Sequence, residues 1–146
     1  MALAAGLARE SEGLRLVPYL CPAGFLTVGF GHRTDSKKVI SIREANEWLR
    51  GDLAIARRGV ADDVATRCTT NQLAALLSFV MNVGGAAFAA STMKRLIVLD
   101  RMSEAAAQFV RWDKATVNGK LVTLPGLTIR REAERTMFEC TRDLSN

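Results

Sequence analysis

Apolar residues recur at helical spacing in the first segment of the chain. Leu3, Leu7 and Leu14 are four and seven residues apart, and they predict a helix from about Leu3 to Leu14. Gly13 is a typical helix-ending residue, because it has no Cβ to oppose a left-handed backbone. Aromatic and β-branched residues then flank a Cys-Pro-Ala-Gly turn between Tyr19 and Gly31, which predicts a β-hairpin.

Two capping boxes mark the starts of the next long helices. Ser41 and Glu44 form the first box and predict a helix that runs to about Arg58. Thr69 and Gln72 form the second box and predict the central core helix, which Gly84-Gly85 ends. The expected apolar faces consist of Ala45, Trp48, Leu49, Leu53 and Ala56 in the first helix, and of Leu73, Leu76, Leu77, Val80 and Met81 in the second.

The remaining segments are also mainly helical in pattern. Ser91 or Thr92 is expected to cap a short helix through Leu99. A further helix is predicted for residues 103–112, with Ala106, Phe109 and Trp112 on its buried side.

The C-terminal part begins with a turn signal. Asn118-Gly119 predicts a tight turn, and a last helix is expected from about Thr128 to Arg142. The order is therefore helix, small β element and then many helices, with the β part confined near the N-terminus. This order predicts an α+β fold.

Length and composition are those of a globular protein. The chain has 146 residues, of which 49% are hydrophobic and 24% charged, so it can bury a core, and we expect one domain over residues 1–146. No apolar run reaches the length of a membrane span, and the N-terminus lacks the basic lead of a signal peptide.

The chain is basic, with a net charge of +5 and a pI of about 9.6. Such a charge favours solubility or an anionic polymer as partner: nucleic acid, an acidic membrane face or an anionic cell wall. Charge alone does not choose among these partners.

Cys21, Cys68 and Cys140 are far apart and lack the short spacing of zinc or redox motifs. Reduced thiols are therefore expected, with Cys140 as a small core residue on an apolar helical face. The single histidine and the lack of an acidic cluster also argue against a metal site.

Glu12 is the strongest candidate for chemistry. It falls at the predicted C-terminal end of the first helix, where unpaired carbonyl groups carry partial negative charge. Partial burial there would raise its pKa, as a proton donor to a leaving oxygen requires. The alternative is that Glu12 is one of fifteen surface acids, and on position alone this alternative is favoured.

Three residues of the predicted hairpin carry further polar groups. Thr27 offers a hydroxyl for a water, although a threonine also simply suits a strand. Cys21 lies at a turn, and a cysteine nucleophile would need a histidine base. His32, at the far end of the hairpin, is better explained as a structural histidine.

These residues together carry a family resemblance. Glu12, Cys21 and Thr27 are separated by eight and five residues and are followed by Gly29-Phe30-Gly31-His32. This pattern resembles the active-site signature of the phage-type lysozymes (endolysins), which is Glu, eight residues, Asp or Cys, five residues, Thr, and then Gly-Tyr-Gly-His. The chain departs from it in having Phe30 where tyrosine is usual.

The resemblance extends along most of the chain. Three later segments also match the family in order: residues 78–84 with 87–92, residues 109–112, and residues 124–134. The resemblance implies an α+β lysozyme fold, with a small N-terminal lobe that holds the hairpin, a mainly helical C-terminal lobe and a cleft between them. It implies cleavage of the β-1,4 bond between N-acetylmuramic acid and N-acetylglucosamine in peptidoglycan.

The resemblance also implies roles for residues. Glu12 would be the general acid and Thr27 would position the attacking water. Residue 21, when it is Asp, is thought to place water or to stabilise positive charge on the sugar. Asn82 matches a position that lines the sugar cleft.

In the last matching segment, Arg131 matches an arginine that packs near the catalytic acid, and with Asn82 it is expected to take part in substrate binding. Arg130 is expected to be structural. No cofactor and no metal are implied. We expect a monomer that binds peptidoglycan, without nucleic acid and without membrane insertion. It would be synthesised in the host cytoplasm and would act in the periplasm after holin-type or other release.

Cys21 leaves two interpretations open. A neutral thiol stabilises an oxocarbenium-like transition state far less than a carboxylate does. Either the thiol is partly ionised, or position 21 matters less than Glu12 and Thr27. The second interpretation is favoured, because lytic members of the family carry Cys at this position.

Two other function classes compete with the hydrolase. The first is a wall-binding module that kept the fold but lost the chemistry, because Cys21 replaces a carboxylate. It would bind sacculi without releasing muropeptides. The second is a basic nucleic-acid binder, which rests on the pI alone because the chain has no recognisable helix-turn-helix signature.

Overall fold

The N-terminal part consists of one helix and a small sheet. In the computed structural model, which describes residues 1–140, α1 (Ala2–Glu12) ends at Gly13, whose φ is 64°. Strands β1 (Arg15–Leu20), β2 (Leu26–Gly29) and β3 (His32–Arg33) follow in one antiparallel sheet. The predicted helix and hairpin are confirmed, and β3 is an addition that the sequence pattern did not indicate.

The Cys-Pro-Ala-Gly turn joins β1 to β2 as expected. The Gly24 N–H donates to the Cys21 carbonyl oxygen at 2.8 Å, and Gly24 has a φ of 84°. Thr27 lies opposite Tyr19 in the β1–β2 register. The turn and this register bring residue 21 and residue 27 to the same end of the sheet.

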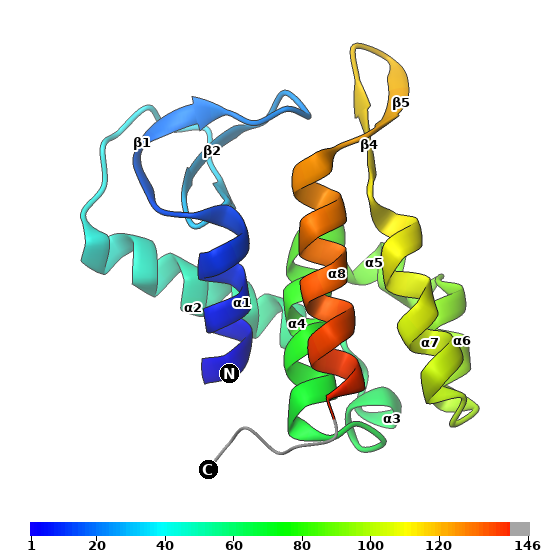
Figure 1. The fold of residues 1–146 in the computed structure, drawn as a ribbon. Coiled ribbons are helices and arrows are strands. Elements are labelled where there is room, and N and C mark those ends of the chain that lie inside the picture. Colours follow the sequence, from blue (N-terminus) through cyan, green and yellow to red (C-terminus); the bar gives the residue numbers. More distant parts are fainter. Residues whose placement is uncertain (141–146) are drawn as a thin grey trace.

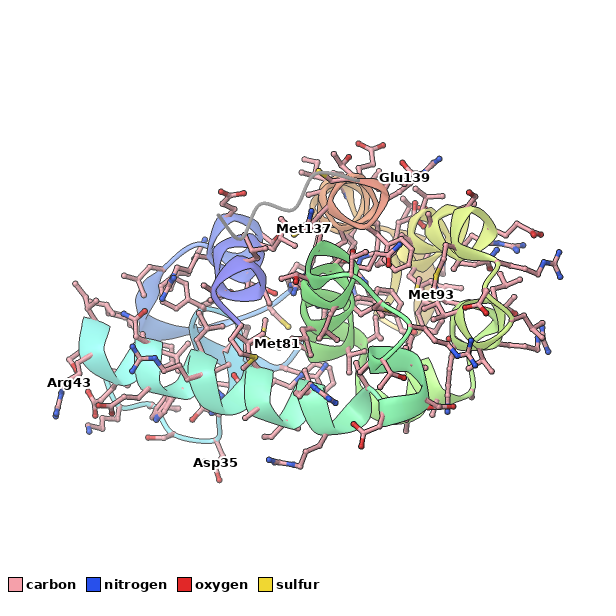
Figure 2. The ribbon with its side chains drawn as sticks, turned by 90° about the horizontal axis from the view of Figure 1, so that it is seen from below. Asp35, Arg43, Met81, Met93, Met137 and Glu139 are labelled. Atoms are coloured by element: carbon pink, nitrogen blue, oxygen red, sulfur yellow. The ribbon has the colours of Figure 1, made fainter. Side chains whose placement is uncertain are left out.

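Both capping boxes are present. Ser41 begins α2 (Ile42–Gly59) and Thr69 begins α4 (Thr70–Val83), and each cap exchanges hydrogen bonds with the residue three positions on. Between them lies α3 (Asp62–Ala65), a single turn. In Figure 2, α2 runs lengthwise beneath both α1 and α4, with Arg43 at its outer end and Met81 of α4 above it.

Short helices complete the C-terminal part. These are α5 (Gly85–Ala89), α6 (Thr92–Val98) and α7 (Met102–Gln108), which continues as a 3-10 turn, η1 (Phe109–Trp112). Ser91 is the cap of α6. The expected helix over residues 103–112 is therefore an α-helix that tightens into 3-10 geometry, with Phe109 fully buried.

A second hairpin corrects the expectation that β structure is confined near the N-terminus. Strands β4 (Lys114–Val117) and β5 (Lys120–Thr123) pair across the Asn118-Gly119 turn. All four residues of β5 are exposed, and β4 has only two half-buried residues, so the burial pattern that marks a strand in a sequence is weak here. Figure 1 shows it extending upward beyond the end of α8.

The last helix, α8 (Pro125–Glu139), begins earlier and ends earlier than expected. Pro125 occupies its first turn, where a missing N–H costs nothing. Cys140 follows the helix and is half-buried, so its expected place on an apolar helical face is wrong. The expected continuation to Arg142 lies outside the described residues.

The core lies where α4 is surrounded by its neighbours. Figure 1 shows α4 and α8 side by side at the centre, α1 and α2 on one flank, and α6 and α7 on the other. Phe79 of α4 is fully buried and meets the Phe88, Phe109 and Trp112 rings edge-on. This arrangement places the β1–β3 sheet on one side of the α4 C-terminus and the β4–β5 hairpin on the other.

Candidate active site

A cleft of about 910 Å³ lies between the β1–β3 sheet and the C-terminal helices. The sheet side supplies Tyr19, Cys21, Thr27, Gly31, His32 and Arg33, together with Ser11 and Glu12 from the end of α1. Its floor and opposite wall include Asp52, Ile55, Val80, Met81, Asn82, Trp112, Lys114, Leu124 and Leu127. The cleft therefore brings together four of the residues that the sequence selected: Glu12, Cys21, Thr27 and Asn82.

Glu12 is the last residue of α1, and its side chain is 23% exposed. Arg130 of α8 donates a hydrogen bond to its carboxylate. The carboxyl group is thus fixed on one side by a buried cation and open on the other side to the cleft. A carboxyl group held in this way can deliver a proton to an oxygen atom in the cleft.

Gly31 closes the space behind Glu12. A Cβ at this position would lie 2.7 Å from Glu12 Cδ and 2.9 Å from its Oε2, and the φ of Gly31 is +81°. Both the close approach and the left-handed backbone require glycine. Gly31 therefore acts on the site through its backbone.

Thr27 is almost completely buried, with 4% of its surface exposed, yet it lines the cleft. Its hydroxyl donates to the Phe25 carbonyl oxygen at 3.0 Å, and it also interacts with the Cys21 thiol. The hydroxyl of Thr27 and the thiol of Cys21 therefore form one polar spot on the sheet side of the cleft.

The Cys21 thiol is more acidic than an ordinary cysteine. Burial raises its pKa, but hydrogen bonds from the backbone N–H groups of Phe25 and Ala23 act in the opposite direction. The Thr27 hydroxyl and the charge of Arg33 add to these hydrogen bonds, and the net result is a lowered pKa for Cys21. These contacts stabilise the thiolate of Cys21 relative to the neutral thiol.

This difference in acidity predicts selective alkylation. Burial raises the pKa of Cys68 to about 11, so Cys68 is a poor nucleophile at neutral pH. Iodoacetamide at pH 7.5 is expected to modify Cys21 at least about tenfold faster than Cys68, because the thiolate is the reacting form. Peptide mass spectrometry over time measures both rates.

The modified Cys21 side chain would also occupy the cleft, so hydrolytic activity should fall in step with its modification. A Cys21→Ser protein serves as the control, because its remaining activity should resist the reagent. Equal reaction rates at Cys21 and Cys68, or full activity after modification of Cys21, would contradict the assignment.

Arg130 and Arg131 of α8 both lie near Glu12, but of the two only Arg130 donates a hydrogen bond to it. Arg130, which was expected to be structural, contacts Glu12, whereas Arg131 is fully buried and donates to Asn82 Oδ1 at 3.0 Å. Arg131 is not among the residues that line the cleft, and it reaches the cleft through Asn82. Adjacent helical residues point about 100° apart, so a shift of one position changes which neighbour an arginine meets.

His32 has partners that suit a structural histidine. Its Nδ1 lies 2.9 Å from an Asp52 carboxylate oxygen, and its ring packs at 4.7 Å against the Trp48 ring. The pair joins β3 to α2 on the floor of the cleft. Sequence reasoning missed Asp52, because one acid on a predicted helix face gives no signal of its partner.

Tyr19 is a further cleft residue to which the sequence assigned no role. Its pKa is raised, first by burial and then by the negative charge of Glu12. The Arg15 guanidinium lies 4.4 Å from the centre of its ring and acts in the opposite direction. Tyr19 therefore stays a neutral hydrogen-bonding group beside the carboxyl of Glu12.

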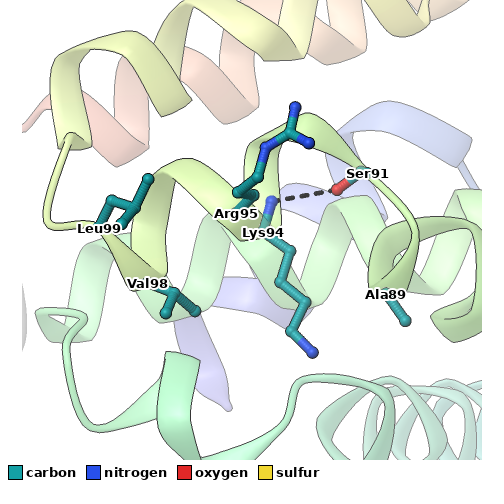
Figure 3. Close-up of a pocket in the computed structure, with 6 residues that line it drawn as sticks. All are labelled: Ala89, Ser91, Lys94, Arg95, Val98 and Leu99. Atoms are coloured by element: carbon teal, nitrogen blue, oxygen red, sulfur yellow. Dashed lines mark hydrogen bonds between the residues drawn. The ribbon is translucent and has the colours of Figure 1, made fainter.

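A second, smaller hollow of about 280 Å³ lies on α6, between Ala89 and Leu99. Figure 3 shows that its two cationic side chains, Lys94 and Arg95, point away from each other. The lining contains no carboxylate or thiol. Of these two hollows in the described part of the chain, the larger cleft combines groups that can transfer a proton with groups that can hold a water.

Comparison with known proteins shows similarity to phage lysozymes along most of the chain. Residues 9–134 match the sequence profile of the family described as phage lysozyme. An endolysin of Acyrthosiphon pisum secondary endosymbiont phage 1 is 40% identical over 135 residues, which cover 91% of this chain and 92% of the relative.

Two solved structures have the same fold. The muramidase domain of SpmX from Asticaccaulis excentricus superposes with a TM-score of 0.84 at 32% identity, over 96% of this chain and 97% of that one. The endolysin from Escherichia coli O157:H7 phage FAHEc1 also gives a TM-score of 0.84, at 30% identity, over 95% and 92% of the two chains.

Proposed function

The chain belongs to the phage lysozyme family, and from this premise we propose that Glu12 is the general acid of its hydrolytic reaction. The protein is a glycoside hydrolase, a lysozyme that degrades peptidoglycan for host lysis. The bond that we propose it cleaves is the β-1,4 bond between N-acetylmuramic acid and N-acetylglucosamine.

The proposed reaction uses both sides of the cleft. Glu12 donates its proton to the glycosidic oxygen while the bond from that oxygen to the sugar breaks, which leaves positive charge on the sugar ring. A water held at Thr27 and Cys21 adds to the anomeric carbon. The proton that this water loses restores Glu12 through solvent.

One observation carries this proposal. The carboxyl group of Glu12 lies between Arg130 and Gly31, and it opens onto the same cleft that the hydroxyl of Thr27 and the thiol of Cys21 line. An acid on a cleft wall with water-binding groups in the same cleft suits glycoside hydrolysis. A thiolate at Cys21 would also stabilise the positively charged sugar.

Asn82 is proposed to bind the sugar chain. Its Oδ1 accepts from Arg131, so its amide N–H groups are left to donate into the cleft that it lines. Such donors suit the carbonyl oxygens of N-acetyl groups.

Digestion of purified Gram-negative sacculi tests the function. Soluble muropeptides should appear, and mass spectrometry after borohydride reduction should identify N-acetylmuramic acid at the new reducing ends. New N-acetylglucosamine reducing ends would assign a different bond. Binding to sacculi without release of muropeptides would instead support a wall-binding module without chemistry.

The remaining proposals concern partners and location. Among the described residues, none of the helices combines the length and the apolar character that crossing a bilayer requires. We propose that a single catalytic domain over residues 1–146 works as a monomer on peptidoglycan in the periplasm. It would be made in the host cytoplasm and freed by a holin-type or other route, and its +5 charge would draw it to anionic surfaces.

A further inference from the structure

A buried ionic network connects the two cleft residues Glu12 and Asn82. Its centre is Glu134 of α8, whose side chain is fully buried. Two consecutive arginines of the same helix contact it, and each arginine reaches a different residue of the cleft. The network therefore links Glu12 to Asn82 through side chains that are buried in the core.

The first branch holds the proposed general acid. Arg130 is 3% exposed, and its Nε donates to Glu134 Oε1 at 3.1 Å. Another nitrogen of the same guanidinium donates to the Ser78 carbonyl oxygen at 3.0 Å, and a third donates to Glu12. Glu134 and Ser78 thus fix the plane of the group that contacts Glu12.

The second branch holds Asn82. Arg131 places its Nε 3.1 Å from Glu134 Oε2, and its NH2 group donates to Asn82 Oδ1 at 3.0 Å. The guanidinium also lies 4.9 Å from the centre of the Phe79 ring. Burial lowers the pKa of Arg131 to about 10, with Glu134 opposing this effect, so Arg131 remains charged at neutral pH.

The three charged residues of α8 in this network have a net positive charge, which Glu12 balances. Arg130 and Arg131 contribute two positive charges and Glu134 one negative charge, which leaves one positive charge facing Glu12. A buried cation that loses its partner is strongly unfavourable, so Glu134 is needed to keep both arginines in place. The Ser78 hydroxyl donates to Glu134 Oε1 at 2.7 Å, the same oxygen that accepts from Arg130 and Arg131.

We propose that Glu134 is a positioning residue of the reaction, which holds Arg130 against Glu12 and Arg131 against Asn82 and sets the charge that Glu12 meets. This inference rests on the proposed role of Glu12 as the general acid. Among the described residues, the titratable groups that interact with Glu12 are Tyr19 from β1 and the two arginines from α8. From α4, the neutral Ser78 and Asn82 bond to these arginines.

Changes of charge in the network predict opposite shifts in the pH profile. A general acid loses activity as the pH rises and its proton is lost, which gives the alkaline limb of the profile. Glu134→Gln leaves two positive charges facing Glu12, so this limb should move down by about one pH unit. Arg131→Met leaves no net positive charge facing Glu12, so the alkaline limb should move to higher pH by about one unit.

The double variant Arg131→Met with Glu134→Gln restores one positive charge and should return the limb to its parental position. Glu139→Gln is the matched surface control, because Glu139 pairs with Arg135 on the exposed side of the same helix. It should leave the limb unmoved. The measurement is the initial rate of dye release from labelled sacculi between pH 4 and 9, with circular dichroism at each pH.

A merely structural role for Glu134 predicts a different result. Activity would then fall in proportion to the folded fraction, with the alkaline limb unchanged in every variant, and that result would overturn the inference. If Glu134→Gln does not fold, Arg131→Met and the double variant decide the question through their predicted difference in limb position.

The failure of this inference differs from the failure of the proposed function. Activity retained in Glu12→Gln would remove the general acid itself. An inactive Glu12→Gln protein together with an unmoved limb in the α8 variants would leave the general acid in place and overturn only the role of Glu134.

Discussion

Glu12→Gln is expected to lower the rate of peptidoglycan hydrolysis by about a thousandfold, the middle of the range for loss of a general acid. The amide has almost the shape of the carboxyl group but cannot donate a proton to a leaving oxygen. It still offers an oxygen to Arg130, so the buried arginine keeps a partner. The measurement is the initial rate of muropeptide release, with far-UV circular dichroism and thermal unfolding to check the fold.

Glu10→Gln is the matched control for this variant. Glu10 lies on the same helix two residues earlier, is exposed and does not line the cleft. Its substitution removes the same charge and should leave the rate within about twofold of the parent, because surface changes of this kind have small effects. Full activity in Glu12→Gln would show that the proton comes from another group.

Gly31→Ala is expected to reduce activity by at least about a hundredfold, because misplacing a reacting group by about 1 Å costs that much. The added Cβ would lie 2.7 Å from Glu12 Cδ, so the carboxyl group has to move. The left-handed backbone adds strain of about 1 to 3 kcal/mol, which thermal unfolding should register. Rates measured well below the melting temperature separate the two effects.

Gly51→Ala provides the comparison. Gly51 lies within α2 and has open space around its added Cβ, so alanine there should keep activity and stabilise the helix by up to about 1 kcal/mol. A Gly31→Ala protein with parental activity would contradict the view that this glycine shapes the position of Glu12.

Local signals predicted the starts of the long helices because they act over a few residues. The pairs Ser41 with Glu44 and Thr69 with Gln72 satisfy the first N–H groups of α2 and α4 whatever surrounds those helices. The same holds for Gly13, which ends α1 and so fixes where Glu12 lies. The part of the site that depends on local structure was therefore visible in the sequence.

The β elements were predicted less well, because they depend on weak or distant contacts. The β3 strand has two residues and is defined by its pairing with β2. It is too short to contain a run of strand-forming residues from which a strand could be predicted. The Asn118-Gly119 turn was visible, but the strands that flank it expose most of their side chains. Alternation is limited to the four residues of β4, where Ala115 and Val117 are half-buried, and β5 shows none.

The roles of the charged residues could not be read from spacing. Arg130 and Arg131 are adjacent and chemically identical, and only the packing of α8 against α1 and α4 decides which of them meets Glu12. Glu134 looks like any helical surface acid in the sequence, yet it is fully buried between both arginines. The contacts of the two arginines with Glu12 and Asn82 join residues 118 and 49 positions apart and require the assembled fold.

The most direct test of the account is a crystal structure of the Glu12→Gln protein with a peptidoglycan fragment that spans the bond to be cut. We expect the glycosidic oxygen within about 3 Å of the side-chain amide of residue 12, with a water at Thr27 and Cys21 facing the anomeric carbon. A fragment bound elsewhere, or one whose glycosidic oxygen is turned away from residue 12, would contradict the central claim that Glu12 protonates the wall glycan.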